Sequence, residues 1–294
     1  MSYFPDDCGR GTPQVAANLL AVVLLAASLG TKAACASALQ VQSFAGSLAG
    51  FHSNSHFIIS DGKALMVDAQ FNTSDAKGAS RFLAERGIEL ERILITHSHP
   101  DHYYGLEHFG KEYPELTILA GEKTAEAIAG SLKQWSKNAE VPAAWKQSVS
   151  TLAVNPVGYG ELELNASRIV YASWSGLESV ENTVLYIPSL EALFTGDLVS
   201  NGFHLWLAED RIENWLAAIE KLYAFGTVKT IYPGHGPNGD TTLIEKAVQY
   251  INHFVEITGT AESPEVAIAK MLALYPDYQL TQVLIGSVYA TMSP

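Results

Sequence analysis

Cysteine is nearly absent from this chain of 294 residues, which contains only Cys8 and Cys35. Both lie in the first forty residues, a segment whose composition differs from that of the rest. If this segment is removed as a leader, the mature chain contains no cysteine. A disulfide framework, a thiolate metal ligand and a cysteine nucleophile are then all excluded.

Basic residues are also scarce, because 18 lysines and arginines stand against 31 aspartates and glutamates, for a formal net charge of -13. The basic residues form no cluster, so the electrostatic footprint of a nucleic-acid-binding protein is missing. We therefore expect a small-molecule substrate and no nucleic-acid partner. Hydrophobic residues make up 48% of the chain, which is typical of a globular protein with a full core.

A nearly uninterrupted apolar run, Val15 to Gly30, is short for a membrane-spanning helix. Small residues follow it, and Ala-x-Ala patterns end at Ala36 and at Ala38, as expected for cleavage by a signal peptidase. We expect residues 1–38 to be a cleaved signal peptide. The mature protein would then be periplasmic or secreted, without stable insertion in a membrane. An uncleaved anchor and a lipoprotein attached through Cys35 are the alternatives.

The densest group of chemically active side chains is the segment Thr96 to Gly105, which reads Thr-His-Ser-His-Pro-Asp-His-Tyr-Tyr-Gly. It follows residues 92–95, an apolar run typical of a buried strand. Three imidazoles and one carboxylate therefore lie on a loop at one end of a sheet. Zinc, iron and manganese accept imidazole nitrogen and carboxylate oxygen as ligands, so we predict a metal site here. The alternative, a polar loop with histidines exposed by chance, is disfavoured by the density of the cluster.

Three further polar residues directly follow apolar strand-like runs: Asp68, Asp197 and His235. Glycines beside the last two permit tight turns. Taken alone, each residue has a simpler explanation, as a buried histidine with a backbone partner or as an aspartate that caps a turn. Because the ends of strands gather residues that are distant in sequence, the four places together predict one shared site.

These segments resemble the signatures of the metallo-β-lactamase superfamily of metallohydrolases. The matching residues are the His-x-His-x-Asp-His motif at 97–102, Thr195-Gly196-Asp197 and Pro233-Gly234-His235, with Asp68 ending an earlier strand. The resemblance implies an α+β protein, a four-layer αββα sandwich that carries the site along one edge of two packed sheets. We expect this domain to span residues 39–258 and a short C-terminal helical extension to span residues 259–294.

The resemblance also implies a role for each residue of the shared site. It assigns a first metal to His97 and His99. It assigns a second metal to Asp101, His102 and His235. Asp197 would bridge both metals, and Asp68 would lie beneath them and steady the histidine loop. The expected cofactor is two divalent metal ions, with zinc as the first choice and iron or manganese as alternatives.

The sequence departs from the family pattern at one ligand of the first metal, where a third histidine normally precedes the strand at Thr183. Counting back from that strand places Glu178 at the histidine position, whereas counting forward from Gly176 gives Leu177, which cannot bind metal. We expect Glu178 to replace the imidazole, since carboxylates are competent zinc and manganese ligands. The alternatives are a shifted loop that presents Glu181, or a first site that is weak or empty.

The activity that the resemblance implies is hydrolysis by metal-activated water. Two cations that share a water lower its pKa from about 16 toward 7 and so provide hydroxide at neutral pH. Asp101 would orient this nucleophile and then carry its proton, which makes it the predicted catalytic residue. We expect an exported hydrolase of a small ester, lactone, thioester or amide. The alternatives are a β-lactam hydrolase and a degenerate, non-catalytic metal-binding protein on the same scaffold.

The remaining elements follow from local patterns. Asp61-Gly62 between two apolar runs predicts a hairpin, and residues 76–86 and 101–111 predict helices. Beyond Gly259, apolar spacing predicts two short helices at 264–274 and 280–289. We expect these helices to pack against the domain or a second subunit rather than to take part in catalysis, so a homodimer is one expectation for the assembly.

Overall fold

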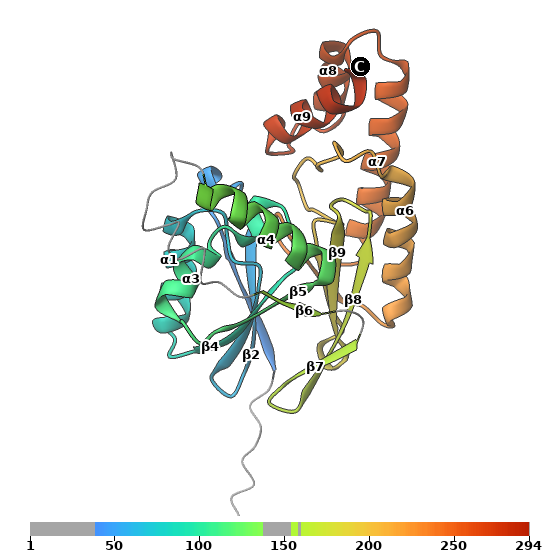
Figure 1. The fold of residues 1–294 in the computed structure, drawn as a ribbon. Coiled ribbons are helices and arrows are strands. Elements are labelled where there is room, and N and C mark those ends of the chain that lie inside the picture. Colours follow the sequence, from blue (N-terminus) through green and yellow to red (C-terminus); the bar gives the residue numbers. More distant parts are fainter. Residues whose placement is uncertain (1–38, 138–153, 158–159, 294) are drawn as a thin grey trace, which may run out of the picture. The chain divides into compact units, whose positions relative to one another are not determined.

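The computed structural model describes residues 39–137, 154–157 and 160–293 (Figure 1). The predicted signal peptide, residues 1–38, lies outside the described residues. Among the helices of the described ranges, none is long and apolar enough to cross a membrane.

Six strands form the first sheet, in the order β1-β2-β3-β4-β5-β6. Their bounds are β1 Gln40–Ala45, β2 Asn54–Ser60, β3 Lys63–Val67, β4 Glu89–Ile95, β5 Thr117–Gly121 and β6 Val154–Val157. The pairs from β1 to β3 are antiparallel and those from β3 to β6 are parallel. Asp61 and Gly62 join β2 to β3 with φ values of 49° and 75°, as a tight hairpin turn requires. The hairpin prediction is confirmed.

The second sheet contains five strands in the order β11-β10-β9-β8-β7. Their bounds are β7 Gly160–Leu164, β8 Ser167–Ser175, β9 Glu181–Ile187, β10 Ala192–Gly196 and β11 Thr230–Pro233. Neighbours from β7 to β10 are antiparallel, and β10 runs parallel to β11. A buried apolar cluster joins the inner faces of the two sheets and includes Leu65 and Leu94 from the first sheet and Leu185 and Phe194 from the second.

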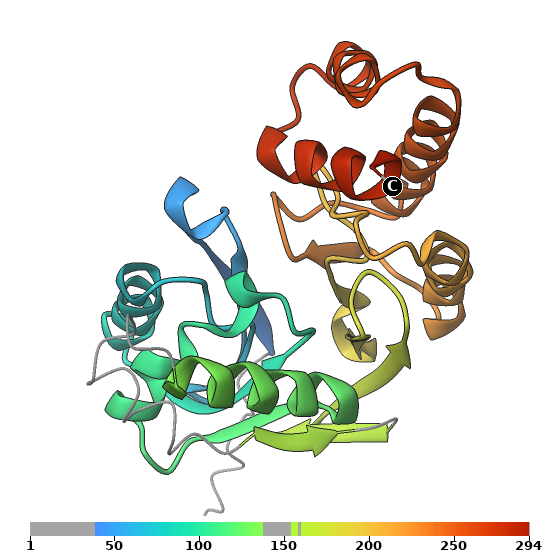
Figure 2. The same cartoon turned by 45° about the horizontal axis from the view of Figure 1, so that its top comes forward.

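Helices cover the outer face of each sheet (Figure 1). The first sheet packs against helices that precede β6, with the bounds α1 Thr73–Ala84, α2 Pro100–Tyr103, α3 Leu106–Glu112 and α4 Glu122–Lys137. The second sheet packs against α6 Ile212–Lys221 and α7 Thr242–Thr260. Two more helices, α8 Pro264–Leu274 and α9 Thr281–Met292, follow α7 and pack with it (Figure 2). The predicted four-layer αββα sandwich with C-terminal helices is confirmed.

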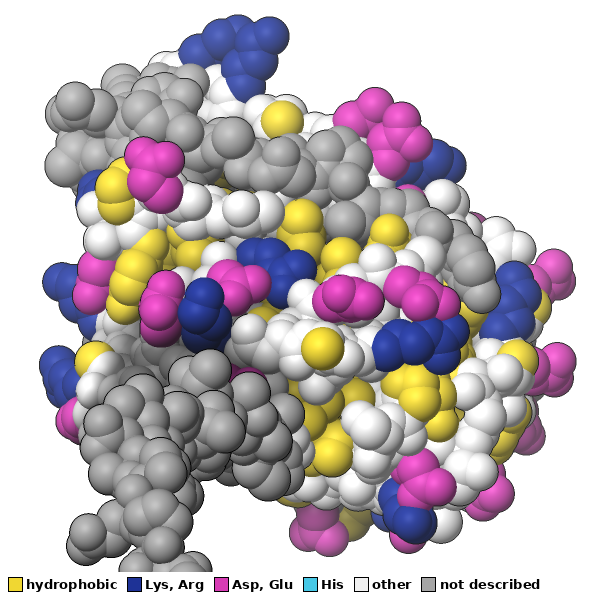
Figure 3. Space-filling view, turned by 90° about the horizontal axis from the view of Figure 1, so that it is seen from below, with side chains coloured by type: hydrophobic (Ala, Val, Ile, Leu, Met, Phe, Trp, Pro, Cys, Tyr) yellow, Lys and Arg dark blue, Asp and Glu magenta, His cyan; other side chains and the backbone are white. Residues whose placement is uncertain are grey.

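Short 3-10 helices complete the described fold at Leu48–Gly50 (η1), Pro188–Leu190 (η2) and Leu222–Phe225 (η3). On the face shown in Figure 3, lysines and arginines are interspersed with acidic side chains rather than gathered in one patch. This arrangement agrees with the scattered basic residues of the sequence.

The predicted helix at 101–111 is instead two helices, α2 and α3, with a break at Gly105. A Cβ atom on Gly105 would lie 1.9 Å from the backbone oxygen of Ala69, so the close approach of these two segments requires glycine. Two backbone hydrogen bonds hold the approach: Gly105 N donates to Gln70 O at 2.8 Å, and Ala69 N donates to His102 O at 2.6 Å. These two hydrogen bonds therefore hold the histidine loop against the end of β3.

Candidate metal centre

The polar residues predicted to share a site all follow strand ends. Asp68 follows β3, the histidine motif follows β4, Asp197 follows β10, and His235 lies two residues beyond β11. Because β3 is parallel to β4 and β10 is parallel to β11, the ends of each pair meet at one edge of its sheet. The two sheets pack face to face, so both edges supply side chains to the same place.

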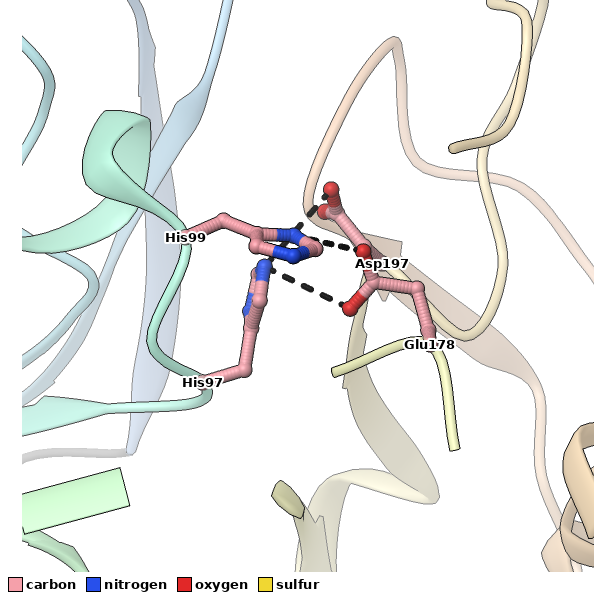
Figure 4. A group of neighbouring side chains, drawn as sticks. All are labelled: His97, His99, Glu178 and Asp197. Carbon is pink, nitrogen blue, oxygen red and sulfur yellow. Dashed lines mark ion pairs between the residues drawn. The ribbon is translucent and has the colours of Figure 1, made fainter. Parts of the chain in front are cut away.

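The first cluster combines His97, His99, Glu178 and Asp197, which offer ligand atoms that all lie within 4.8 Å of one another. His97 Nε2 lies 3.6 Å from Glu178 Oε2 and 3.8 Å from Asp197 Oδ2. His99 Nδ1 lies 2.6 Å from Glu178 Oε1. Figure 4 shows the two histidines reaching from one loop toward the two carboxylates, which come from the opposite side.

The second cluster combines Asp101, His102 and His235. His235 Nε2 lies 3.2 Å from Asp101 Oδ2 and 3.2 Å from Asp197 Oδ2. His102 Nε2 lies 3.5 Å from Asp101 Oδ2 and 3.3 Å from Asp197 Oδ1. Asp197 therefore contacts both clusters and stands where a bridging ligand is expected.

The chemistry of these atoms fits two divalent cations. His97 Nε2, His102 Nε2 and Asp197 Oδ1 are buried and have no hydrogen-bond partner among the described residues. Leaving buried polar atoms without a partner is costly, and a cation at each cluster would satisfy them. Ligands about 2.0–2.1 Å from a tetrahedral zinc lie roughly 3.3 Å apart, close to most separations seen here. Each cluster also supplies two imidazoles and one carboxylate of its own, in addition to Asp197.

The structure places Glu178, and not Glu181, beside His97 and His99. The Glu178 side chain is fully buried, and its Oε2 accepts a hydrogen bond from Asn182 Nδ2 at 3.0 Å. Glu181 points elsewhere, since its Oε2 accepts from the backbone N of Thr124 at 3.0 Å, near the start of α4. Of the two carboxylates that the sequence left open, Glu178 is the one that joins the first cluster.

Asp68 orients the ring of His102 from below the clusters. Its Oδ2 accepts hydrogen bonds from His102 Nδ1 at 2.9 Å and from Thr96 Oγ1 at 2.8 Å, and its Oδ1 accepts from Thr96 N at 2.7 Å. Because Nδ1 of His102 donates here, its Nε2 is free to face Asp197 as a lone-pair donor. His97 is held in the same way, since its Nδ1 donates to Thr96 Oγ1 at 2.9 Å.

Two orienting contacts were missed by the sequence reasoning. The sequence motif gives no role to Thr96, whose Oγ1 lies between His97 Nδ1 and Asp68 Oδ2. His235 Nδ1 donates to the backbone oxygen of Phe51 at 2.9 Å. No side-chain pattern can indicate a backbone acceptor that is distant in sequence, so this second contact had no signal.

Without metal, the clusters form a network of buried ion pairs. Burial opposes a charge on His99 and on His235, but nearby carboxylates outweigh it. Glu178 chiefly raises the pKa of His99 to about 9, and Asp197 chiefly raises the pKa of His235 to about 10. Burial alone would raise the pKa of Asp197, yet His102 and His235 hold it well below its usual range. For His97, burial prevails and lowers the pKa.

Comparison with known proteins identifies the family. The profile of the Metallo-beta-lactamase superfamily matches residues 48–235. The chain belongs to this superfamily. A hydroxyacylglutathione hydrolase of Aliivibrio salmonicida (strain LFI1238) is 24% identical over 213 residues, which cover 71% of this chain and 72% of the relative. The probable metallo-hydrolase YqgX of Bacillus subtilis (strain 168) is 22% identical over 209 residues, which cover 68% of this chain and 93% of the relative.

Solved structures agree with the fold. A metallo-beta-lactamase from Pontibacter korlensis superposes with a TM-score of 0.57 at 19% identity, covering 73% of this chain and 99% of that one. The family match, the hydrolase relatives and the two ligand clusters together show that the chain is a metal-dependent hydrolase of the metallo-β-lactamase superfamily.

We predict that Asp68→Asn weakens metal binding at the second cluster by about 10- to 100-fold. The new amide group would face the donors Thr96 Oγ1 and His102 Nδ1, so the ring of His102 loses its fixed orientation. Metal titration against a competing chelator measures the effect. Asp277→Asn, the same change at an exposed residue, is the control, and equal affinities for the two variants would contradict the prediction.

We also predict that metal binding releases protons and strengthens as the pH rises. In the metal-free protein His99 and His235 are protonated at neutral pH, because their pKa values are raised to about 9 and about 10. A cation must displace these protons, so apparent affinity increases up to about pH 10, roughly tenfold per pH unit for each displaced proton. Calorimetry in buffers of different ionisation enthalpy counts the protons. A pH-independent affinity from about pH 7 to about pH 9 would refute this account.

Proposed function

We propose that this hydrolase cleaves a small ester, lactone, thioester or amide. The observation that carries the proposal is the pair of ligand clusters that share Asp197 at the side of a cavity of about 500 Å³. His99, Asp101, Asp197 and His235 all line that cavity, so a bound substrate would meet both clusters directly. The relative from Aliivibrio salmonicida supports an acyl substrate through its name, hydroxyacylglutathione hydrolase.

The residues of the two clusters have distinct roles in the proposed hydrolysis. Two divalent cations, held by the residues of the two clusters, would lower the pKa of a bound water and polarise the acyl oxygen of the substrate. Asp101 lines the cavity, and although burial opposes its ionisation, His102 and His235 hold its pKa well below the usual range. Its carboxylate is therefore ionised at neutral pH and can orient the attacking water by accepting a hydrogen bond from it, before the proton passes to the leaving group.

The cofactor we propose is two zinc ions, with iron or manganese as the alternatives. Glu178 adds an oxygen ligand at the position where the family pattern has an imidazole, which favours harder cations at the first cluster. The number of ions bound per chain tests whether both clusters hold metal.

We predict two metal ions per chain, with hydrolysis of at least one member of a panel of p-nitrophenyl esters, lactones, thioesters and amides. Removal of metal by a chelator abolishes this activity, and added zinc, iron or manganese restores it. Glu178→Gln, which removes the charge but keeps the shape, lowers first-cluster affinity by roughly tenfold or more. Metal analysis and steady-state kinetics measure these effects.

Glu181→Gln is the matched control, because the same change falls three residues away, outside both clusters. It keeps an oxygen that can accept from the backbone of Thr124, so metal content and kcat/KM stay near those of the unmodified protein. A fully metal-loaded enzyme that is inert on every acyl substrate would overturn the proposed function. Fewer than two ions per chain would contradict the proposal of two bound metals.

We further propose that residues 1–38 are a cleaved signal peptide and that the mature hydrolase is periplasmic or secreted. The apolar run and the Ala-x-Ala patterns that end at Ala36 and Ala38 support this proposal. We predict that the exported protein begins at Ser37 or Leu39, which intact mass spectrometry of a periplasmic extract determines. A full-length chain found in the cytosol or the membrane would disprove it.

A further inference from the structure

The cavity beside the ligand clusters is mainly apolar and aromatic on its other walls. Its apolar and aromatic lining includes Phe51, Phe71, Tyr104, Trp206, Leu280 and Val283. Phe71 stacks on Tyr104 with ring centroids 5.4 Å apart and planes 15° apart, and Phe51 meets Phe71 edge-on at 5.4 Å. These contacts pre-form a surface that suits a hydrocarbon chain or ring.

The same cavity offers no side-chain cation to an anionic substrate. Among the described residues that line it, there is no lysine or arginine. Apart from the metal ligands, the one carboxylate among the described lining residues belongs to Glu209, which pairs at 3.4 Å with Arg211, a residue outside the lining. His204 also lines the cavity, but burial lowers its pKa to about 4, so its ring is neutral. A carboxylate on the substrate would lose water here and gain no cationic side chain as a partner.

The metal centre itself adds little attraction for an anion. Two divalent cations would be offset by the three carboxylates of Asp101, Glu178 and Asp197, which leaves a single net positive charge. The hydroxyl nucleophile required for hydrolysis would neutralise it. The metal centre and the cavity lining therefore provide no net positive charge that would attract a carboxylate on the acyl group of the substrate.

Helix α9 is part of this cavity, since Gln282 and Val283 line it, together with Leu280 directly before the helix. Its position is fixed against the segment 202–207, which follows Asp197. Backbone hydrogen bonds run from Gln279 N to Gly202 O at 2.9 Å and from His204 N to Gln279 O at 3.1 Å.

Side chains strengthen this attachment further along α9. Ser287 Oγ accepts from Leu207 N at 2.9 Å. A Cβ atom on Gly286 would lie only 2.7 Å from the ring of Trp206, so the backbone of α9 packs directly against that indole. Trp206 in turn meets the ring of His99 edge-on, with centroids 6.5 Å apart. The C-terminal helix and the first ligand cluster thus lie on two sides of one tryptophan.

We propose that this cavity binds the uncharged, apolar acyl group of the substrate, and that α9 determines this selectivity. The proposal rests on the proposed function, because it names the class of acyl group that the hydrolase accepts. Gln282 and Val283 are the specificity-determining residues that α9 contributes.

A matched pair of esters tests the selectivity of the metal-loaded enzyme. The p-nitrophenyl ester of hexanoic acid and the mono-p-nitrophenyl ester of adipic acid have acyl chains of equal length, and only the second ends in a carboxylate. We expect kcat/KM to be roughly 10- to 100-fold higher for hexanoate, since the site leaves the carboxylate unpaired. An equal or reversed preference would overturn the proposal.

Two lysine variants of α9 test where the selectivity arises. Gln282→Lys places a cation in the cavity lining, so we expect the preference for hexanoate to shrink at least about tenfold, mainly through a lower KM for the adipate ester. Ile285→Lys is the control, because Ile285 is exposed on the same helix and does not line the cavity. A change of the same size in both variants would show that α9 does not set selectivity through the cavity.

Binding of hexanamide and of adipic acid monoamide, followed by calorimetry, separates this inference from the proposed function. Preferential binding of hexanamide by a protein that hydrolyses no acyl substrate supports the cavity assignment and refutes the proposed function. Hydrolysis of acyl substrates without a preference for the uncharged chain supports the proposed function and refutes the cavity assignment. Failure of both amides to bind, together with no ester preference, overturns the cavity assignment.

Discussion

The buried carboxylate of Asp68 is the constraint on which the metal centre depends. Its backbone has φ 63°, a left-handed conformation that costs a non-glycine residue about 1–2 kcal/mol. Three accepted hydrogen bonds, two from Thr96 and one from His102, offset that cost. Thr96 O accepts in turn from Thr183 N of β9 at 2.7 Å. One carboxylate thus connects the first sheet, the histidine loop and the second sheet.

Glu178 makes the two ligand clusters chemically alike. Each now has two imidazoles, one carboxylate of its own and a share of Asp197. A third histidine in the first cluster would instead leave one more positive charge on the loaded centre. Asn182 donates a hydrogen bond to Glu178 Oε2 and so helps to orient the carboxylate. The replacement of a histidine by Glu178 therefore changes the charge of the first cluster, while Asn182 keeps the carboxylate oriented.

Much of this arrangement could be predicted because it follows from strand ends. Asp68, Asp197 and His235 each end or closely follow an apolar run, and parallel neighbours bring such positions together. The sequence favoured Glu178 but left Glu181 open as an alternative, because the choice depends on how the loop before β9 folds, with Gly176 at φ 72°. The break at Gly105 was missed for a similar reason, since it reflects an approach by backbone 36 residues away in sequence, at Ala69.

The C-terminal helices illustrate another limit, because apolar spacing indicates that a helix packs but not that it also borders a cavity. Residues 279–287 clamp the segment 202–207 through backbone and side-chain hydrogen bonds. These residues are synthesised after every member of the two ligand clusters, the last of which is His235. A nascent chain can therefore contain every member of the two clusters before the helix that completes the cavity has been synthesised.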